Sequence, residues 1–282
     1  MLNHKSLRRK AMACAAMVAA ALVGLSTSAV AAPQVGVQAL DELIGSAHGT
    51  VLRGSTPSGT PMLARFQYHY ASADHHIRSV AAMPLPQQSA VEITFADENS
   101  DDEYSYRVSH EKVDPTGIVQ GTFHGTCTGQ CSVLLNTRPS TNSVFVLTGF
   151  RFAYNTADHH LDKIAVSAAG SVLTTAFRDQ NGDDPYTYDV SYAWVPRNRF
   201  GTVAEILSTV HASGITSPVA ASGEKVIRGF FVDNLATGDA GDNHIKDLGV
   251  VANANSFDVL FGDENPANSA DWRYQVQYAV LL

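Results

Sequence analysis

The chain has 282 residues, of which 45% are hydrophobic, 16% charged and 9% aromatic, and its formal net charge is −8. This composition is typical of a globular protein. It excludes a disordered tail, a collagen-like rod and a disulfide-dense miniprotein.

Residues 1–32 have the pattern of a secretory signal peptide. Four basic residues precede an apolar stretch over 11–25, and small residues follow over 29–32. Cys14 stands at the start of the apolar stretch, where a lipoprotein cleavage box would not place it, so we expect no lipid anchor. No later segment approaches about 18 uninterrupted apolar residues. We therefore expect an exported protein, periplasmic or extracellular, without membrane insertion.

The charge of the remaining chain limits its partners. Removal of the signal peptide leaves 15 basic against 27 acidic residues, a net charge of about −12. A surface this acidic repels phosphate backbones and anionic lipid headgroups. Nucleic acid is therefore not an expected partner, whereas cations and neutral polar ligands are compatible with the charge.

A polar motif occurs three times at a constant separation of 84 residues: Asp74-His75-His76, Asp158-His159-His160 and Asp242-Asn243-His244. Each copy is followed by a Phe-x-Asp-x-Asn motif, which begins at Phe95, Phe177 and Phe261, and then by an aromatic-x-Tyr-x-Val motif, which begins at Tyr104, Tyr186 and Trp272. Such self-similarity indicates a repeat architecture. We expect the signal peptide over 1–32 and three repeats over 33–113, 114–195 and 196–282.

Each repeat is expected to be built of β-strands, because apolar and polar side chains alternate along it. In chain order, expected strands lie at 66–70 and 150–154, at 164–166 and 248–250, at 172–177, and at 186–194. Asn181-Gly182 stands between the last two, and this dipeptide predicts a hairpin loop. The segment 203–210 comes nearest to a helical period, but it is equally open to a strand.

The expected fold is all-β, with three tandem small antiparallel β-sandwich units of about five or six strands each and an approximate internal threefold repetition. Two arrangements are compatible with it: three sandwiches packed against each other, which we favour because no long Gly/Ser linkers separate the copies, or one larger body with approximate threefold symmetry. Cys127 and Cys131 are expected to form a local disulfide, as cysteine pairs do in an oxidising compartment.

The repeated polar residues are the candidates for function. Candidate ligand-binding residues are Asp74, His75, His76, Asp158, His159, His160, Asp242, Asn243 and His244. If the following strand starts without a bulge, His76, His160 and His244 point to the core edge, while His75 and His159 fall on the opposite face. A structural role, with each imidazole hydrogen-bonded at the core edge, is the alternative.

The acidic loops favour a calcium hypothesis, because Asp and Asn supply the oxygen ligands that Ca²⁺ prefers. Candidate metal ligands are Asp97, Asn99, Asp101, Asp102, Asp179, Asn181, Asp183, Asp184, Asp263, Asn265 and Asp271. Solvated turns rich in Asp and Asn are the alternative. Zinc is less favoured, because no fixed set of four ligands occurs in all three copies. No catalytic motif is present, so we expect a protein that is not an enzyme.

In strand order and spacing, each repeat resembles an H-type lectin domain, a small six-stranded β-sandwich. The resemblance rests on a Gly-containing strand at 121–125, a hydrophobic strand at 144–152, His160 before the next strand, a Phe-centred strand at Phe177 and a closing aromatic strand at 186–194. It implies three associated units that bind galactose-type sugars near their edges, with no calcium needed for the sugar contact. The Trp usual in the closing strand of that family is Tyr192 or Tyr278 here, and His110 in the first copy.

We therefore expect a secreted, non-enzymatic protein that binds carbohydrate or another polar surface ligand multivalently through its repeated loops. The alternative is a structural protein of the envelope or extracellular matrix that calcium stabilises. No cofactor is required by the sequence, and Ca²⁺ is the one that it suggests.

Overall fold

The computed structural model describes residues 37–55, 58–72, 75–99, 102–156, 159–180, 184–211, 213–235, 244–263 and 271–282. Apart from two short 3₁₀ helices, η1 (Pro86–Gln88) and η2 (Arg197–Arg199), the regular elements in these ranges are β-strands. The all-β prediction with three repeated units is confirmed.

Six strands come from each repeat. The first repeat contains β1 (Val37–His48), β2 (Thr50–Gly54), β3 (Thr60–Tyr70), β4 (Ile77–Leu85), β5 (Ala90–Asp97) and β6 (Glu103–Val113). The second contains β7 (Val119–Thr128), β8 (Gln130–Leu134), β9 (Ser143–Tyr154), β10 (Leu161–Ala169), β11 (Val172–Asp179) and β12 (Pro185–Pro196). The third contains β13 (Phe200–Val210), β14 (Gly214–Pro218), β15 (Lys225–Asn234), β16 (Ile245–Ala252), β17 (Ser256–Asp263) and β18 (Trp272–Leu281). The ambiguous segment 203–210 thus lies in a strand.

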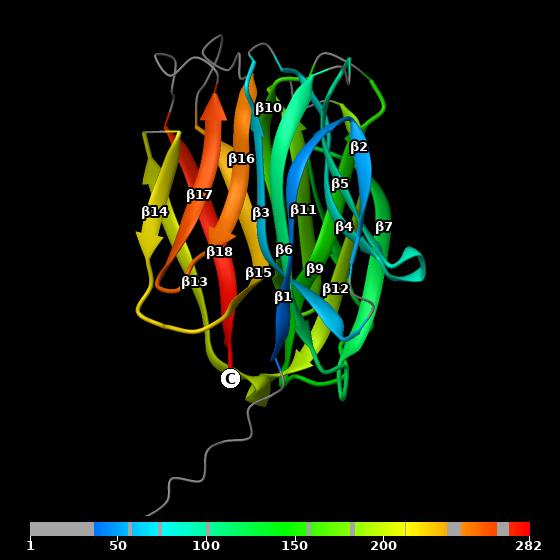
Figure 1. Ribbon diagram of the computed structural model, residues 1–282, viewed down its shortest axis with the longest axis vertical. Helices are drawn as coiled ribbons and strands as arrows, with labels where there is room; N and C mark the ends of the chain where they lie inside the picture. The colour runs from blue at the N-terminus through cyan, green and yellow to red at the C-terminus, as the bar shows by residue number, and fades with distance from the viewer. Residues whose placement is uncertain are drawn as a thin grey trace, which may run out of the picture. The chain divides into compact units, whose positions relative to one another are not determined.

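These strands form three antiparallel six-stranded sheets, and each sheet takes three strands from each of two repeats (Figure 1). Sheet A has the order β1-β6-β3-β16-β17-β14, sheet B the order β2-β5-β4-β9-β12-β7, and sheet C the order β13-β18-β15-β10-β11-β8. The repeats meet at the pairs β3–β16, β4–β9 and β10–β15, which we call the seams. The sandwiches are therefore joined by backbone hydrogen bonds as well as by side-chain packing.

The Asn181-Gly182 hairpin prediction is wrong in its strand partners, although the dipeptide itself lies outside the described residues. β11 pairs with β10 and β8 in sheet C, whereas β12 pairs with β7 and β9 in sheet B. Both strands have one apolar face. They bury these faces against the same core from different sheets, so the connection between them crosses from sheet to sheet.

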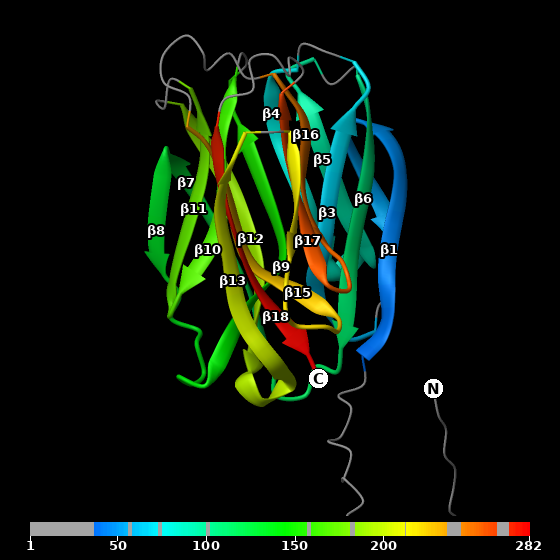
Figure 2. The same cartoon turned by 90° about the vertical axis from the view of Figure 1, so that its left-hand side faces the viewer.

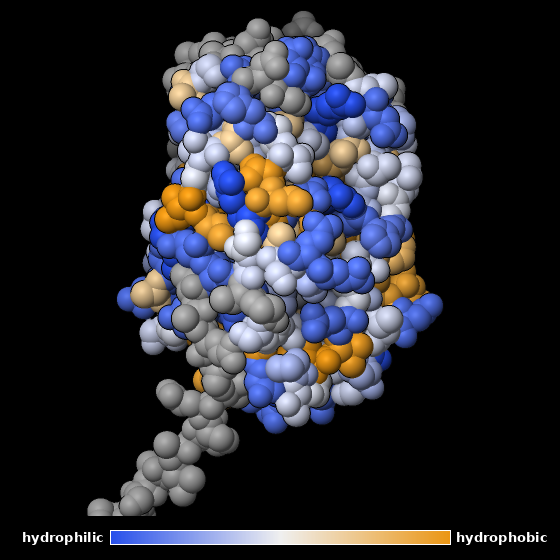
Figure 3. All heavy atoms as spheres, turned by 45° about the vertical axis from the view of Figure 1, so that its right-hand side comes forward, coloured by the Kyte–Doolittle hydropathy of each residue, from blue (hydrophilic) through white to orange (hydrophobic). Residues whose placement is uncertain are grey.

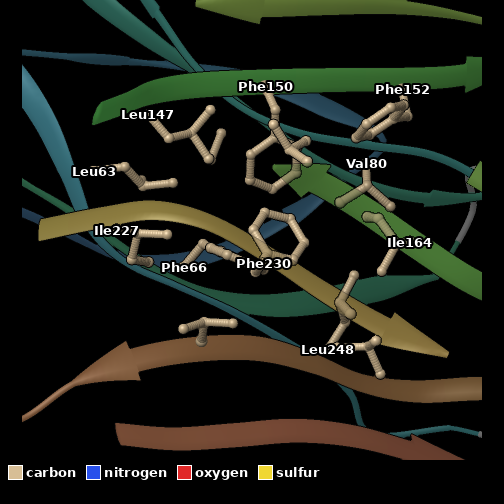
Figure 4. Close-up of a cluster of buried hydrophobic side chains, with 14 of the residues drawn as sticks. Leu63, Phe66, Val80, Leu147, Phe150, Phe152, Ile164, Ile227, Phe230 and Leu248 are labelled. Atoms are coloured by element: carbon tan, nitrogen blue, oxygen red, sulfur yellow. The ribbon is translucent and has the colours of Figure 1, made fainter. Parts of the chain in front are cut away.

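Equivalent side chains of the three repeats meet along a central axis (Figure 4). Phe66, Phe150 and Phe230 contact each other with ring centroids 4.8 to 5.3 Å apart. Two further layers of equivalent residues are also fully buried: Val80, Ile164 and Leu248, and Leu63, Leu147 and Ile227. One continuous core therefore holds all three repeats together.

The outer faces of the sheets are largely polar, and the apolar side chains visible in Figure 3 form separate small patches. The most exposed large apolar residues, Ile44, Leu134 and Leu207, lie on the edge strands β1, β8 and β13. Scattered apolar residues of this kind are normal on soluble proteins and define no docking surface. Cys127 and Cys131 form the expected disulfide, which links the end of β7 to β8.

A small cavity of about 190 Å³ lies where the first and third repeats meet, and its lining includes Arg65, Glu111, Glu224 and Lys225. Glu111 is buried on β6. Burial, together with the neighbouring carboxylate of Glu224, raises the pKa of Glu111 to about 7.

The folded protein is therefore expected to lose stability as the pH rises from about 4.5 to about 7, because the folded state keeps a proton on Glu111 that the unfolded chain releases. Glu111→Gln keeps a neutral side chain at all pH values and should flatten this part of the pH dependence. Urea unfolding across that pH range measures the effect, with the exposed Glu205→Gln as control. An unchanged slope in Glu111→Gln would show that another group sets the dependence.

Candidate metal centres at one end of the strands

The Asp-His-His motif lies in the connection that leads to a seam strand in each repeat. His76 directly precedes β4, His160 precedes β10 and His244 precedes β16. These are the strands that pair with another repeat, and they begin at the end of the sheets that is uppermost in Figure 2. The residue in front of β4, β10 and β16 is therefore brought close to the central axis.

His76, His160 and His244 meet at that axis, and we call them the axial histidines. Their ring centroids are 4.4, 4.9 and 5.0 Å apart in the three pairs. One ligand nitrogen from each ring lies within 4.8 Å of the other two. All three residues are half-buried. Each repeat thus contributes one imidazole to a single cluster.

A second type of cluster joins the other histidine of the motif to the acidic loops. In the first repeat, Nδ1 of His75 lies 3.6 Å from a carboxylate oxygen of Asp97 and 3.6 Å from one of Asp102. In the second, Nδ1 of His159 lies 3.4 Å from Asp179 and 3.5 Å from Asp184. These lateral clusters unite residues that the sequence placed in separate ligand and calcium hypotheses.

Both lateral histidines are held in place by the same contacts. His75 stacks on Tyr70 and His159 on Tyr154, with ring centroids 3.7 and 3.8 Å apart. On the other side of the ring, Nε2 is hydrogen-bonded to a hydroxyl, at 3.2 Å from Ser72 Oγ in the first repeat and 3.0 Å from Thr156 Oγ1 in the second. With Nε2 occupied by a hydroxyl, Nδ1 is the nitrogen turned to the carboxylates.

The stacking tyrosines stay neutral donors. Burial, and after it the nearby carboxylate of Asp97 or Asp179, raises the pKa of Tyr70 and Tyr154 well above the usual range. Tyr154 donates to the carbonyl oxygen of Phe177 at 2.8 Å, and Tyr70 donates to that of Phe95. Neither tyrosine was among the candidate site residues expected from the sequence. Their position five residues before His75 and His159 in both repeats is the signal that identifies them.

The condition on which the expected facing of the histidines rested is not met, because β4, β10 and β16 each begin with an irregular register. The pairing register shifts between Ile77 and Ser79, between Leu161 and Lys163, and between Ile245 and Asp247. A bulge breaks the strict alternation of faces on which the expectation depended. His75 and His159, which stand one residue before the axial histidines, are fully buried.

The remaining candidates are not gathered into these clusters. Asn99 is exposed, Asp263 ends β17, and Asp271 accepts a hydrogen bond from His211 at 3.0 Å. Asp74, Asp101, Asp158, Asn181, Asp183, Asp242, Asn243 and Asn265 lie outside the described residues, as does the expected signal peptide.

The donor chemistry of the clusters differs from a calcium site. Ca²⁺ takes six to eight oxygen ligands in general, whereas imidazole is a ligand for zinc, copper, iron and nickel. An all-imidazole cluster and a mixed imidazole–carboxylate cluster are both ligand sets of first-row transition metals.

Among the described residues, no helix has the length and apolar character needed to cross a membrane. Comparison with known proteins finds no family model that matches the chain and no curated protein that matches its sequence.

Proposed function

We propose that this is an exported, non-enzymatic protein that binds a divalent transition-metal ion, zinc in the first place, through the axial histidines. The observation that carries the proposal is the convergence of His76, His160 and His244, one from each repeat, with ligand nitrogens within 4.8 Å of one another. Three imidazoles are an established protein ligand set for Zn²⁺, with bond lengths of about 2.0–2.1 Å. Two nitrogens bound to one tetrahedral zinc are about 3.3 Å apart, so the three rings would have to approach one another to bind a single ion.

The ion would have two consequences. It would join the three repeats directly through their side chains, at the end of the sheets where β4, β10 and β16 begin. Because a three-histidine set leaves a fourth position of a tetrahedral ion for a water or another oxygen ligand, the ion could also take part in binding a polar ligand from solvent.

Zinc is expected to stabilise the chelator-treated protein, by about 2.7 kcal/mol when free zinc is one hundred times the dissociation constant. In His244→Asn this gain should shrink, because two imidazoles bind the ion less tightly than three. Melting curves with and without zinc measure it, and His211→Ala is the control, since His211 is an exposed histidine paired with Asp271 away from the axis. An equal gain in His244→Asn and the unmodified protein would refute axial binding. Stabilisation by Ca²⁺ and not by Zn²⁺ would favour the calcium-stabilised structural alternative.

A second candidate function is multivalent, lectin-like binding of glycans. Its support is that β4, β10 and β16, the strands that follow the polar motifs, all begin at the same end of the sheets (Figure 2). Several weak sites that face one way raise avidity on a surface that displays many copies of a ligand.

A glycan array probed with zinc, with calcium and with a chelator tests this second candidate. Binding that zinc restores after chelation would make the metal part of the glycan site. Binding under all three conditions would place the sugar contact on the side chains alone. If a folded sample binds no glycan with either metal, the lectin-like function is refuted and metal binding is the remaining proposal.

A further inference from the structure

We propose that the two lateral clusters are metal sites of a second kind, distinct in residues and chemistry from the axial one. Each would bind one divalent first-row cation through His75 Nδ1, Asp97 and Asp102 in the first repeat, and through His159 Nδ1, Asp179 and Asp184 in the second. The proposal does not depend on whether the axial histidines bind metal, because it uses none of the same side chains.

The spacing of the donor atoms supports the presence of an ion between them. At 3.4 to 3.6 Å, the separations of Nδ1 from the two carboxylate oxygens are longer than a good direct N–H···O hydrogen bond. Two ligand atoms bound to one tetrahedral zinc at about 2.0–2.1 Å are about 3.3 Å apart. The nitrogen–oxygen separations are therefore close to those around a bound cation, and the three donor atoms of each cluster lie within 4.8 Å of one another.

Burial and charge favour the same conclusion. The side chains of His75 and Asp97 are 0% and 4% exposed, whereas that of Asp102 is 47% exposed; His159, Asp179 and Asp184 repeat this pattern at 1%, 1% and 39%. Each cluster thus has a buried floor and one solvent-facing carboxylate, which gives an ion an access route. An imidazole that binds a metal is neutral, so each cluster as a ligand set would carry a charge of −2, which a divalent cation balances.

The third repeat shows that the lateral residues change as a set. Counted from the shared motifs, the positions of Tyr70, His75 and Asp102 are occupied there by Asn234, Asn243 and Ala270. Only the counterpart of Asp97, Asp263, is kept. The axial histidine is present in all three repeats. In the third repeat it directly follows Asn243, which takes the place of the lateral histidine.

This pattern is the one expected if the two histidines of the motif belong to different sites. The axial site needs one residue from every repeat, whereas a lateral site is complete within one repeat and can be lost from one alone. The loss of three lateral residues while the adjacent axial histidine stays is what two separate clusters would give, and metal counting tests whether the lateral ones hold an ion.

The surroundings of the imidazole complete the site. Stacking on the tyrosine fixes the ring plane, and the hydroxyl of Ser72 or Thr156 at Nε2 fixes the ring orientation with Nδ1 toward the carboxylates. Partners at the second ring nitrogen of this kind are a regular feature of histidine metal ligands. The mixed nitrogen and oxygen donors suit Zn²⁺, Co²⁺ or Mn²⁺, whereas calcium needs more oxygen donors than the described residues bring together.

The test is metal counting on the purified full chain after chelation and reloading with zinc, by elemental mass spectrometry, with Co²⁺ as a spectroscopic substitute. The unmodified protein should bind three ions, one axial and two lateral. Asp102→Asn combined with Asp184→Asn should reduce the count to one, and His244→Asn should reduce it to two. The cobalt spectra of these two variants should differ, because one retains an all-imidazole site and the other mixed sites.

Misfolding of the lateral variant is controlled by its metal-free melting temperature. Each Asp→Asn change keeps the side-chain shape and removes one negative charge, so the metal-free variant should melt no lower than the metal-free parent. A count that the paired Asp→Asn change leaves unaltered would overturn the lateral sites. If only one ion is bound and His244→Asn abolishes it, the axial proposal stands and the lateral one fails. If two ions are bound and His244→Asn leaves both in place, the reverse holds.

Discussion

Phe150→Ala is expected to lower the free energy of unfolding by about 3–5 kcal/mol, the usual cost of a large cavity at a fully buried phenylalanine. Phe150 is fully buried and contacts both Phe66 and Phe230, so its ring joins all three repeats at one point. The three sheets meet there and cannot close around the gap without breaking the seams. Urea or guanidinium unfolding, with the slope checked against the parent, measures the loss.

Phe123→Ala serves as the matched control. Phe123 is half-buried on the edge strand β7. Its ring stacks on Tyr188, which belongs to the same repeat. Its loss should cost clearly less than that of Phe150. Equal costs would mean that the contact between repeats at the axis adds nothing to stability, which contradicts a single shared core.

Gly149→Ala is expected to be the second most damaging change, with a loss of about 1–3 kcal/mol or more. A Cβ atom at Gly149 would lie 2.3 Å from Cδ of Pro84 and 2.5 Å from the carbonyl oxygen of Ala82, both on β4 across a seam. These neighbours are a proline ring and backbone, which cannot swing aside as a flexible side chain would. The seam β4–β9 would have to open, and thermal unfolding should show a lower melting temperature.

A glycine also allows close approach of the two strands at the other two seams. Gly229 on β15 approaches the carbonyl oxygen of Val166, and Gly249 on β16 approaches that of Phe66, so that an added Cβ would lie 2.7 and 2.8 Å from these atoms. Gly54→Ala is the control, because a Cβ there meets nothing within 4 Å in an equally regular strand. It should leave stability unchanged or raise it slightly. A harmless Gly149→Ala would show that the seams can separate without cost.

The strands were predictable from the sequence where alternation was strong. The aromatic run from Tyr186 to Trp194 lies in β12, and the Phe66 and Phe150 segments lie in β3 and β9. Strand partners were not predictable, because periodicity shows which face of a strand is buried and not which neighbour it pairs with. The seam glycines were visible in the sequence, but a close approach of another repeat cannot be recognised without its coordinates.

The sequence named the clustered residues one by one as candidates and did not predict how they are arranged. The histidines and aspartates of the three clusters were all candidates, yet the sequence suggested one equivalent site in each repeat. The spacing of 84 residues between His76, His160 and His244 is compatible both with three separate sites and with one site on an axis. Only the shared sheets, which bring the starts of β4, β10 and β16 together, decide between them.

The repeats contribute differently to the two kinds of cluster. Each repeat supplies one imidazole to the axis, and the first two also carry a lateral cluster of their own. In our account the axial ion closes the loop end of the body, and the lateral ions order the acidic connections beside it. Acidification should release both kinds of ion, because protons compete with metal for imidazole nitrogen.

Anomalous diffraction at the zinc absorption edge, from crystals of the zinc-loaded full chain, tests the central claim most directly. The account expects a strong anomalous peak between the imidazole rings of His76, His160 and His244, with zinc–nitrogen distances of about 2.0–2.1 Å. Zinc-loaded crystals that diffract well and show no peak at the axis would contradict it, even if peaks occurred at the lateral clusters.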